Sequence, residues 1–438
     1  MPIKVGFVSL GCAKNQIDTE YMLGSIQKNQ KFEIVQDENS AEVIVINTCA
    51  FIQSAKEEAI NTILEFVKKK EKNVKSIIVT GCLAQRYQKE ILQNIPEIDA
   101  VLGINSQNLL ETAIENSLKK IKTEIFETKN SELEKKRVLT TPPHYAYLKI
   151  AEGCNNFCSY CAIPYIRGKY VSRKPQEILK EAKWLEEKNV KEIILIAQDT
   201  TYYGKDLKIN YYLNNLLEDL CKFNFKWIRF LYAYPERIEE NLVETISQNK
   251  KILPYFDIPI QHINDEILTN MNRKTNSKQI VEKINLIRKK IPHATIRTTL
   301  IVGFPQETNE QFEELLNFIK KIKFDRLGCF SYSKEEGTKA ALLKGQIPEK
   351  IKEKRRKKIY QTSEKILKQK SIEQIGKVVE VIVDKKTKDL YIARTKKDLP
   401  EVDCCVFFSS KEKIEIGEII KVKITGIEKN LNLFGILD

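Results

Sequence analysis

The segment YAYLKIAEGCNNFCSYC, residues 145–161, joins an apolar strand to an array of three cysteines. Cys154, Cys158 and Cys161 follow the spacing C-x3-C-x2-C, which is close enough to bind one inorganic centre. A structural zinc site or a closed iron–sulfur cluster normally takes four protein ligands. Three ligands leave one position for an outside molecule, such as one that chelates through an amino and a carboxylate group. The other interpretation is a three-cysteine zinc site, which needs a histidine, and His144 lies nearby.

Six apolar segments, separated by helical patterns, follow one another in the middle of the chain. This alternation predicts a whole or partial α/β barrel, whose working face lies at the carboxyl ends of its strands. The cysteine array directly follows the first of these strands, so we expect it at that face. The strands are expected at 145–150, 192–197, 227–233, 255–260, 294–303 and 326–332.

The N-terminal part also alternates strand and helix, which predicts a doubly wound parallel sheet. Cys12, Cys49 and Cys82 each stand just past one of its strands. That edge of an open α/β sheet is the ligand crevice, and helix N-termini there favour thiolates. The pattern favours a second set of three metal ligands over isolated core cysteines. Strands are expected at 3–9, 42–48, 76–80 and 100–103, and helices near 18–29, 54–69, 84–94 and 106–119.

Three domains are expected. A polar, charged stretch at 120–140 separates the N-terminal part, 1–125, from the barrel, 140–368. After a charged helical run, the pattern changes to five short strands with turn signals, which predicts a small five-stranded antiparallel β-barrel at 370–438.

Charge and composition limit the cellular setting and the partners. The chain has 438 residues and a net charge of +14, and no apolar run approaches the length needed to span a bilayer. We expect a cytoplasmic protein whose clustered cysteines serve metal or redox chemistry. Segment 347–370 carries ten basic and three acidic residues, which leaves room for RNA contact, whereas 371–438 is neutral.

Two further barrel strands end in polar or turn-forming residues. Gln198 and Asp199 end the second strand, where they could contact ribose or an amino acid, or simply cap the strand. Gly303 and Pro305 follow the fifth strand, where glycine lets a ligand approach the backbone, although such a pair usually marks only a turn.

The cysteine array, with Tyr160 before its last cysteine, resembles the signature of radical S-adenosylmethionine (AdoMet) enzymes. The three upstream cysteines resemble those of the methylthiotransferases. NTCAFIQSAKEEAI, CAIPYIRG, DIPIQH, RTTLIVGFP and LPEVD are similar to the branch that modifies ribosomal protein S12, more than to the tRNA-modifying branch. The resemblance covers essentially the whole chain and ends in a domain similar to the TRAM module.

The resemblance implies two [4Fe-4S] clusters, AdoMet as cofactor, and an electron donor such as flavodoxin or ferredoxin. The implied reaction methylthiolates an aspartate of ribosomal protein S12 at its β-carbon, with no catalytic side chain beyond the cluster ligands. Tyr160 is the implied neighbour of adenine, and Gly303 and Pro305 form the implied AdoMet-contacting turn. The implied cluster ligands are Cys154, Cys158 and Cys161 in the barrel and Cys12, Cys49 and Cys82 in the N-terminal part.

Two positions depart from the pattern of the resembled family. Gln306 stands where the resembled family usually has glycine, and the pair Cys404 and Cys405 follows LPEVD where a glycine is common. The acidic turn from Glu401 to Asp403 is interpreted as a docking surface for a basic ribosomal protein.

Two other functions remain open at this point. A tRNA methylthiotransferase would share every cysteine, but its terminal module should carry a basic stripe. A non-catalytic iron–sulfur protein that binds RNA or ribosomes would produce no deoxyadenosine from AdoMet.

Overall fold

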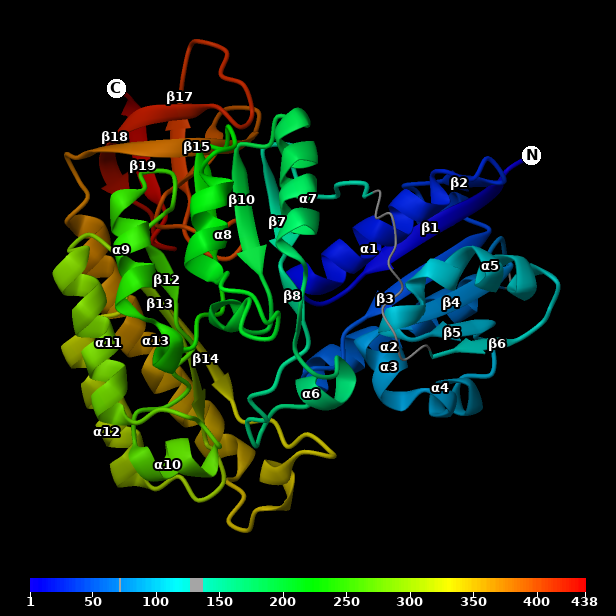
Figure 1. Ribbon diagram of the computed structural model, residues 1–438, viewed down its shortest axis with the longest axis horizontal. Coiled ribbons are helices and arrows are strands. Elements are labelled where there is room, and N and C mark those ends of the chain that lie inside the picture. The colour runs from blue at the N-terminus through cyan, green and yellow to red at the C-terminus, as the bar shows by residue number, and fades with distance from the viewer. Residues whose placement is uncertain (71, 127–136) are drawn as a thin grey trace.

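The computed structural model describes residues 1–70, 72–126 and 137–438. Its N-terminal sheet is parallel throughout, in the order β2-β1-β3-β4-β5-β6 (Figure 1). The chain steps outward from β1 to β2 and then continues from β3 on the other side of β1, so the switch point lies between β1 and β3. The strands are β1 (Ile3–Ser9), β2 (Phe32–Ile34), β3 (Val43–Thr48), β4 (Ser76–Gly81), β5 (Ala100–Leu102) and β6 (Thr123–Ile125).

The pairing of these strands confirms the predicted parallel sheet. Strands β3 and β4 are buried on both faces, as a doubly covered sheet requires. Strands β2 and β6 were not predicted, since three residues give too short a pattern. The predicted helix at 84–94 is broken at Gln88, whose φ is 43°. The helices are α1 (Ala13–Ile26), α2 (Gln53–Lys69), α3 (Cys82–Tyr87), α4 (Lys89–Asn94) and α5 (Leu110–Leu118).

The central domain is a partial barrel of six parallel strands. They form two sheets, β11-β10-β7 and β12-β13-β14, which a parallel bridge between Ile228 and Ile252 connects. Within the described residues no ladder joins β7 to β14, so the barrel is open. The strands are β7 (Tyr145–Lys149), β10 (Glu192–Ile196), β11 (Trp227–Phe230), β12 (Tyr255–Asp257), β13 (Thr295–Val302) and β14 (Arg326–Ser331).

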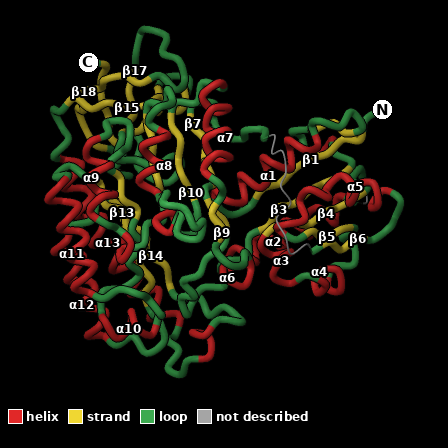
Figure 2. The backbone as a smooth tube through the Cα atoms, viewed as in Figure 1, coloured by secondary structure: helices red, strands yellow, loops and turns green. Residues whose placement is uncertain are grey.

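Helices cover the outside of these strands and enclose the largest apolar core (Figure 2). The long α13 (Glu349–Ile372) confirms the helix expected for the charged run. None of the described helices is long and apolar enough to cross a membrane. The other helices of this domain are α6 (Ile163–Ile166), α7 (Pro175–Glu187), α8 (Leu213–Leu220), α9 (Glu240–Gln248), α10 (Asp265–Asn270), α11 (Ser277–Lys290) and α12 (Asn309–Ile322).

The C-terminal domain is a closed five-stranded barrel in the order β15-β16-β17-β19-β18. The expectation of a wholly antiparallel barrel was wrong at one pair, because β17 and β19 run parallel. An odd number of strands cannot alternate in direction around a closed ring, so one parallel pair is unavoidable. The strands are β15 (Val378–Lys386), β16 (Tyr391–Thr395), β17 (Val406–Ser409), β18 (Ile419–Ile427) and β19 (Leu433–Leu437).

This small barrel packs against the amino ends of the central strands, opposite the end where the cysteine loop begins (Figure 1). His144, just before β7, lies 2.7 Å from Asp384 of β15 through its Nε2 atom. Since Cys154 follows the other end of β7, the structure contradicts a zinc site that combines Cys154 with His144.

The acidic turn is part of the same interface. The Asp403 side chain is 4% exposed, pairs with Arg297 at 2.6 Å and accepts a hydrogen bond from the Tyr255 hydroxyl at 3.0 Å. The interpretation of Asp403 as a docking residue was therefore wrong, because its carboxylate is held inside the interface by Arg297 and Tyr255. Glu401 in the same turn remains exposed.

Glycines turn the chain sharply just before three of the cysteines. Gly11, Gly81 and Gly153 have φ values of 97°, 92° and 78°, in the left-handed region that L side chains rarely adopt. A Cβ atom on Gly153 would also lie 2.1 Å from the carbonyl oxygen of Lys169. Gly168 has a similar φ of 75°, but no heavy atom lies within 4 Å of its Cβ position.

In Gly168→Ala, only the left-handed backbone conformation destabilises the fold, by about 1–2 kcal/mol. In Gly153→Ala, the new Cβ atom must also displace a backbone carbonyl. We expect Gly153→Ala to lower the free energy of unfolding clearly more than Gly168→Ala, as measured by urea unfolding of the full chain. Equal losses in the two variants would show that the close approach at Gly153 does not constrain the turn.

Candidate active site

Cys12, Cys49 and Cys82 follow β1, β3 and β4, three neighbouring strands at the switch point of the N-terminal sheet. Cys12 precedes α1 directly and Cys82 begins α3. The Cβ position of Gly11 lies 3.2 Å from the Cys49 sulfur, which places Cys49 against the turn that carries Cys12. The structure thus brings together the N-terminal triad, the name used below for Cys12, Cys49 and Cys82.

The three thiols of this triad differ in their surroundings. Cys12 is exposed to solvent, yet nearby protein atoms desolvate its thiol and would raise the pKa; Lys14 and Arg167 outweigh this and lower the pKa. Burial raises the pKa of Cys82 to about 11, although Arg167 opposes the shift. An iron bound at Cys82 would therefore have to displace a proton from this thiol, as from any protonated thiol ligand.

Cys154, Cys158 and Cys161 form the barrel triad, in the loop between β8 (Ala151–Glu152) and α6. The Cys161 amide donates to the Cys158 carbonyl at 3.0 Å, so the loop doubles back on itself. Side chains that reach its sulfurs include Asn156, whose Nδ2 atom lies 3.4 Å from Cys154, and Arg273 and Tyr234, whose Nη1 and hydroxyl oxygen lie 3.7 Å and 3.9 Å from Cys158.

Each triad fits an iron–sulfur cluster better than a single ion. Among the described residues, no three His, Cys, Asp or Glu side chains are arranged to hold one metal ion. A four-iron cluster makes a different demand, because each thiolate binds a separate iron at its own corner. Three neighbouring thiols with N–H donors beside their sulfurs match that demand.

Tyr160 and the turn at Gly303–Pro305 lie together. Tyr160 packs against a small apolar cluster that contains Phe304, the middle residue of that turn. The amides of Gly303 and Phe304 both donate to the Glu307 carboxylate, which fixes the turn.

The position of Gln306 explains why glycine suits this turn. Its φ is 69°, so a residue with a Cβ atom must adopt a left-handed conformation. The Gln306 amide donates to the Gly345 carbonyl at 2.9 Å, which holds the residue in place.

Asp199 and Gln198 contact the start of the cysteine loop, through Asn156 and Glu152. Asp199 is 1% exposed and both of its oxygens are used, by Arg237 at 2.6 Å and by Thr201 at 2.7 Å, among others. It also accepts from Asn156 at 3.1 Å and so orients the amide beside Cys154. Gln198 donates to Glu152 at 2.7 Å, while its Oε1 atom is buried and makes no hydrogen bond to described residues.

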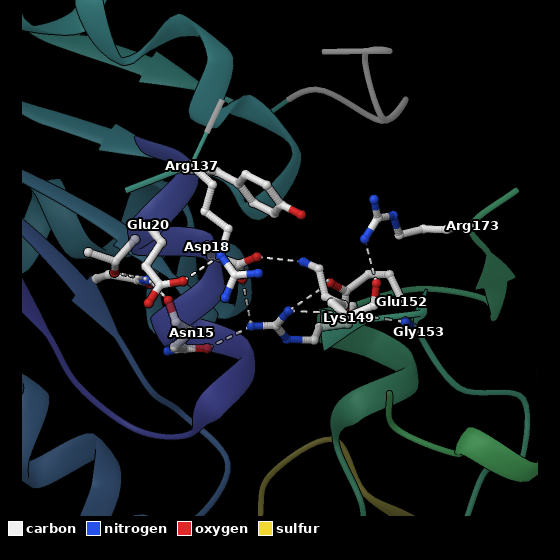
Figure 3. A network of polar contacts seen from close by, with 12 residues as sticks. Asn15, Asp18, Glu20, Arg137, Lys149, Glu152, Gly153 and Arg173 are labelled. Atoms are coloured by element: carbon white, nitrogen blue, oxygen red, sulfur yellow. Dashed lines mark hydrogen bonds and ion pairs between the residues drawn. The ribbon is translucent and has the colours of Figure 1, made fainter. Parts of the chain in front are cut away.

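Sequence reasoning missed a buried ionic network between the two domains (Figure 3). Lys149 contacts Asp18 at 2.6 Å and Glu152 at 2.9 Å. Arg167 binds both oxygens of Glu152 at 3.0 Å. Burial would raise the pKa of Glu152, but Arg167 and Lys149 hold it well below its usual value. A lysine inside the apolar strand YAYLK was the one signal of this network in the sequence.

Three family models match successive parts of the chain. They are described as uncharacterized protein family UPF0004 at residues 4–103, the radical SAM superfamily at 148–319 and the TRAM domain at 375–435. SAM is AdoMet, so the second match agrees with the resemblance seen in the cysteine array.

Solved structures share the fold at low sequence identity. One is the radical S-adenosylmethionine methyltransferase TsrM from Kitasatospora setae, with a TM-score of 0.56 and 13% identity over 76% of this chain and 72% of that chain. Another is the cobalamin-dependent radical enzyme OxsB, with a TM-score of 0.53 and 12% identity over 82% of this chain and 56% of that chain.

Curated relatives are much more similar and match over nearly their whole length. The chain is 50% identical over 429 residues to the ribosomal protein uS12 methylthiotransferase RimO of Clostridium botulinum strain Loch Maree, covering 97% of this chain and 96% of that protein. It is 46% identical to the protein of the same name from Thermoanaerobacter sp. strain X514, covering 96% and 97%. The chain therefore belongs to the RimO family of radical SAM methylthiotransferases.

Proposed function

We propose that this enzyme inserts sulfur and a methyl group at the β-carbon of an aspartate of ribosomal protein uS12. The observation that carries the proposal is the pair of cysteine triads, one at the switch point of the N-terminal sheet and one at the barrel mouth, joined by a shared buried network. The names of the curated relatives support the same substrate.

The proposed metal ligands are the six cysteines of the two triads, three for each [4Fe-4S] cluster. Bound at these triads, the clusters and AdoMet would supply an electron, a radical, the sulfur and the methyl group. The side chains orient this chemistry: Asn156 and Arg273 reach the barrel sulfurs, and Arg167 reaches Cys82. We also propose the domain division 1–125, 140–368 and 370–438.

AdoMet is proposed to lie beside the barrel triad, between two groups of residues. Tyr160 and the turn at Gly303–Pro305 form the apolar side, which suits the adenine ring. Gln198 and Asp199 form the polar side, where the Gln198 oxygen still lacks a partner among the described residues. Asp199 acts there through Asn156, because its own oxygens are already bonded.

We also propose an RNA contact on the surface of α13, an electron donor and a cellular location. Lys352 and Arg355 point into the protein, but other basic side chains of the helix are exposed and are proposed to contact ribosomal RNA. These exposed residues are Lys350, Lys354, Lys357, Lys358, Lys365 and Lys368. A flavodoxin or ferredoxin is the proposed electron donor, and the cytoplasm the proposed location.

The first prediction concerns iron content. Anaerobic reconstitution of the full chain should load about eight irons, the stoichiometry of two four-iron clusters. Replacing Cys154, Cys158 and Cys161 together by alanine should leave about four irons, because the N-terminal triad lies in a separate domain. Replacing Cys221 and Cys329 by alanine, which belong to neither triad, is the control and should leave the iron content unchanged. Complete loss of iron from a folded triple variant would show that the triads do not load independently.

The second prediction separates the roles of the two triads. Alanine at Cys12, Cys49 and Cys82 should block sulfur insertion but spare reductive cleavage of AdoMet, since the barrel triad and its neighbours stay intact. The measurement is deoxyadenosine released per enzyme, alongside mass spectrometry of the uS12 product. A folded variant that keeps the barrel cluster yet no longer cleaves AdoMet would contradict this division.

The third prediction tests the substrate. Purified enzyme with AdoMet and a reductant should add a methylthio group to uS12, as ribosomes or as free protein, and should leave tRNA unmodified. Mass spectrometry of both products decides the outcome. Modified tRNA together with unmodified uS12 would replace the proposed substrate by tRNA.

A further inference from the structure

Arg167 touches groups from both domains and lies between the two triads. It directly follows α6, in the loop that continues from the barrel triad, and its side chain is buried. Its Nη1 atom binds Glu152, while its Nη2 atom donates to Asn15 Oδ1 at 2.6 Å and lies 3.5 Å from the sulfur of Cys82. A residue of the barrel therefore contacts a thiol of the N-terminal triad.

The partners of Arg167 hold its guanidinium in one orientation. Glu152 takes Nη1 with both oxygens, and Asp18 and Asn15 accept from Nη2. Asn15 is itself fixed, because its side-chain amide donates to the carbonyls of Leu10 and Thr48. Nη2 carries two N–H groups, and Asn15, Asp18 and the Cys82 sulfur are the three acceptors that share them.

The arginine near each triad comes from the same domain in one case and from the other domain in the second. Arg273 lies near the Cys158 sulfur and belongs to the same domain as that cysteine. The arginine beside Cys82 comes from the other domain, so the N-terminal triad gains this positive charge only when the domains are docked. Lys14, near Cys12, belongs to the N-terminal domain, and its ammonium group lies 3.9 Å from the ring centroid of Tyr232 in the barrel.

We propose that Arg167 is a positioning residue that raises the reduction potential of the cluster on the N-terminal triad and makes that potential depend on domain docking. The inference rests on the proposed function, because it requires a cluster at Cys12, Cys49 and Cys82. Hydrogen bonds to cluster sulfurs and nearby positive charge stabilise the reduced cluster, which carries one more negative charge. Loss of the guanidinium should therefore lower the potential.

The experiment isolates one cluster. In the full chain with Cys154, Cys158 and Cys161 replaced by alanine, only the N-terminal cluster remains, and its reduction by dithionite is followed by electron paramagnetic resonance at controlled potentials. Arg167→Gln should lower the ratio of reduced to oxidised cluster at a fixed potential about tenfold, a shift of about 59 mV for one electron. Arg167→Lys keeps the positive charge but cannot hydrogen-bond Glu152, Asn15 and the sulfur at the same time. It should therefore lower the reduction potential by less than Arg167→Gln does.

Arg137→Gln is the matched control. Arg137 is as buried as Arg167 and also joins the domains, binding Glu20 of α1 at 2.5 Å and Glu181 of α7 at 2.7 Å, but its contacts are carboxylates and not a thiol. It should leave the potential unchanged, even though it weakens the interface.

The outcomes distinguish the presence of a cluster at the N-terminal triad from the effect of Arg167 on its potential. Absence of a cluster from the background protein with native Arg167 would overturn the proposed function at this triad. A cluster whose potential is the same with Arg167→Gln as with Arg137→Gln would overturn the role of Arg167 alone. Should Arg167→Gln not fold, Arg167→Lys compared with Arg137→Lys decides the matter, and equal potentials in that pair count against the inference.

Discussion

Charged side chains buried between the N-terminal sheet and the central barrel fix how the two cysteine triads face each other. Lys149 and Arg167 come from the barrel, and both bind Asp18 of α1. Removing one partner of such a buried pair costs about 3–5 kcal/mol, because the other charge is left uncompensated. A different docking angle would leave these charges unpaired, so the network favours one arrangement over its alternatives.

A second buried contact prevents rotation about the first. Glu335, in the loop after β14, binds Lys56 of α2 at 2.9 Å and Arg86 of α3 at 3.0 Å. Glu335 is 2% exposed, so this pairing is also largely removed from water. Because the two contacts involve different helices of the N-terminal domain and different ends of the barrel sequence, they constrain its orientation at two places.

The sequence predicted the elements that depend on local pattern and missed those that depend on distant partners. Apolar strands followed by cysteines indicated both triads, since a strand, a turn and the next residue form a local unit. The contact of Asp18 with Lys149 joins residues far apart in the chain, and nothing in the local sequence around either residue indicates the other. The prediction for Asp403 was wrong for the same reason. An acidic turn is expected to be solvated, and its pairing with the distant Arg297 cannot be predicted from the local sequence.

The arrangement of the C-terminal barrel and α13 limits how a substrate reaches the triads. The small barrel covers the amino ends of the central strands, so it leaves their carboxyl face to other partners. Helix α13 begins beside that face, where Arg355 binds the Glu307 carbonyl at 3.0 Å, and ends near the other, where Lys370 meets Asp325 just before β14. Its exposed lysines therefore run along the flank of the barrel. In the proposed function, RNA held on this flank would lie beside the carboxyl face, where the loop of the protein substrate would enter.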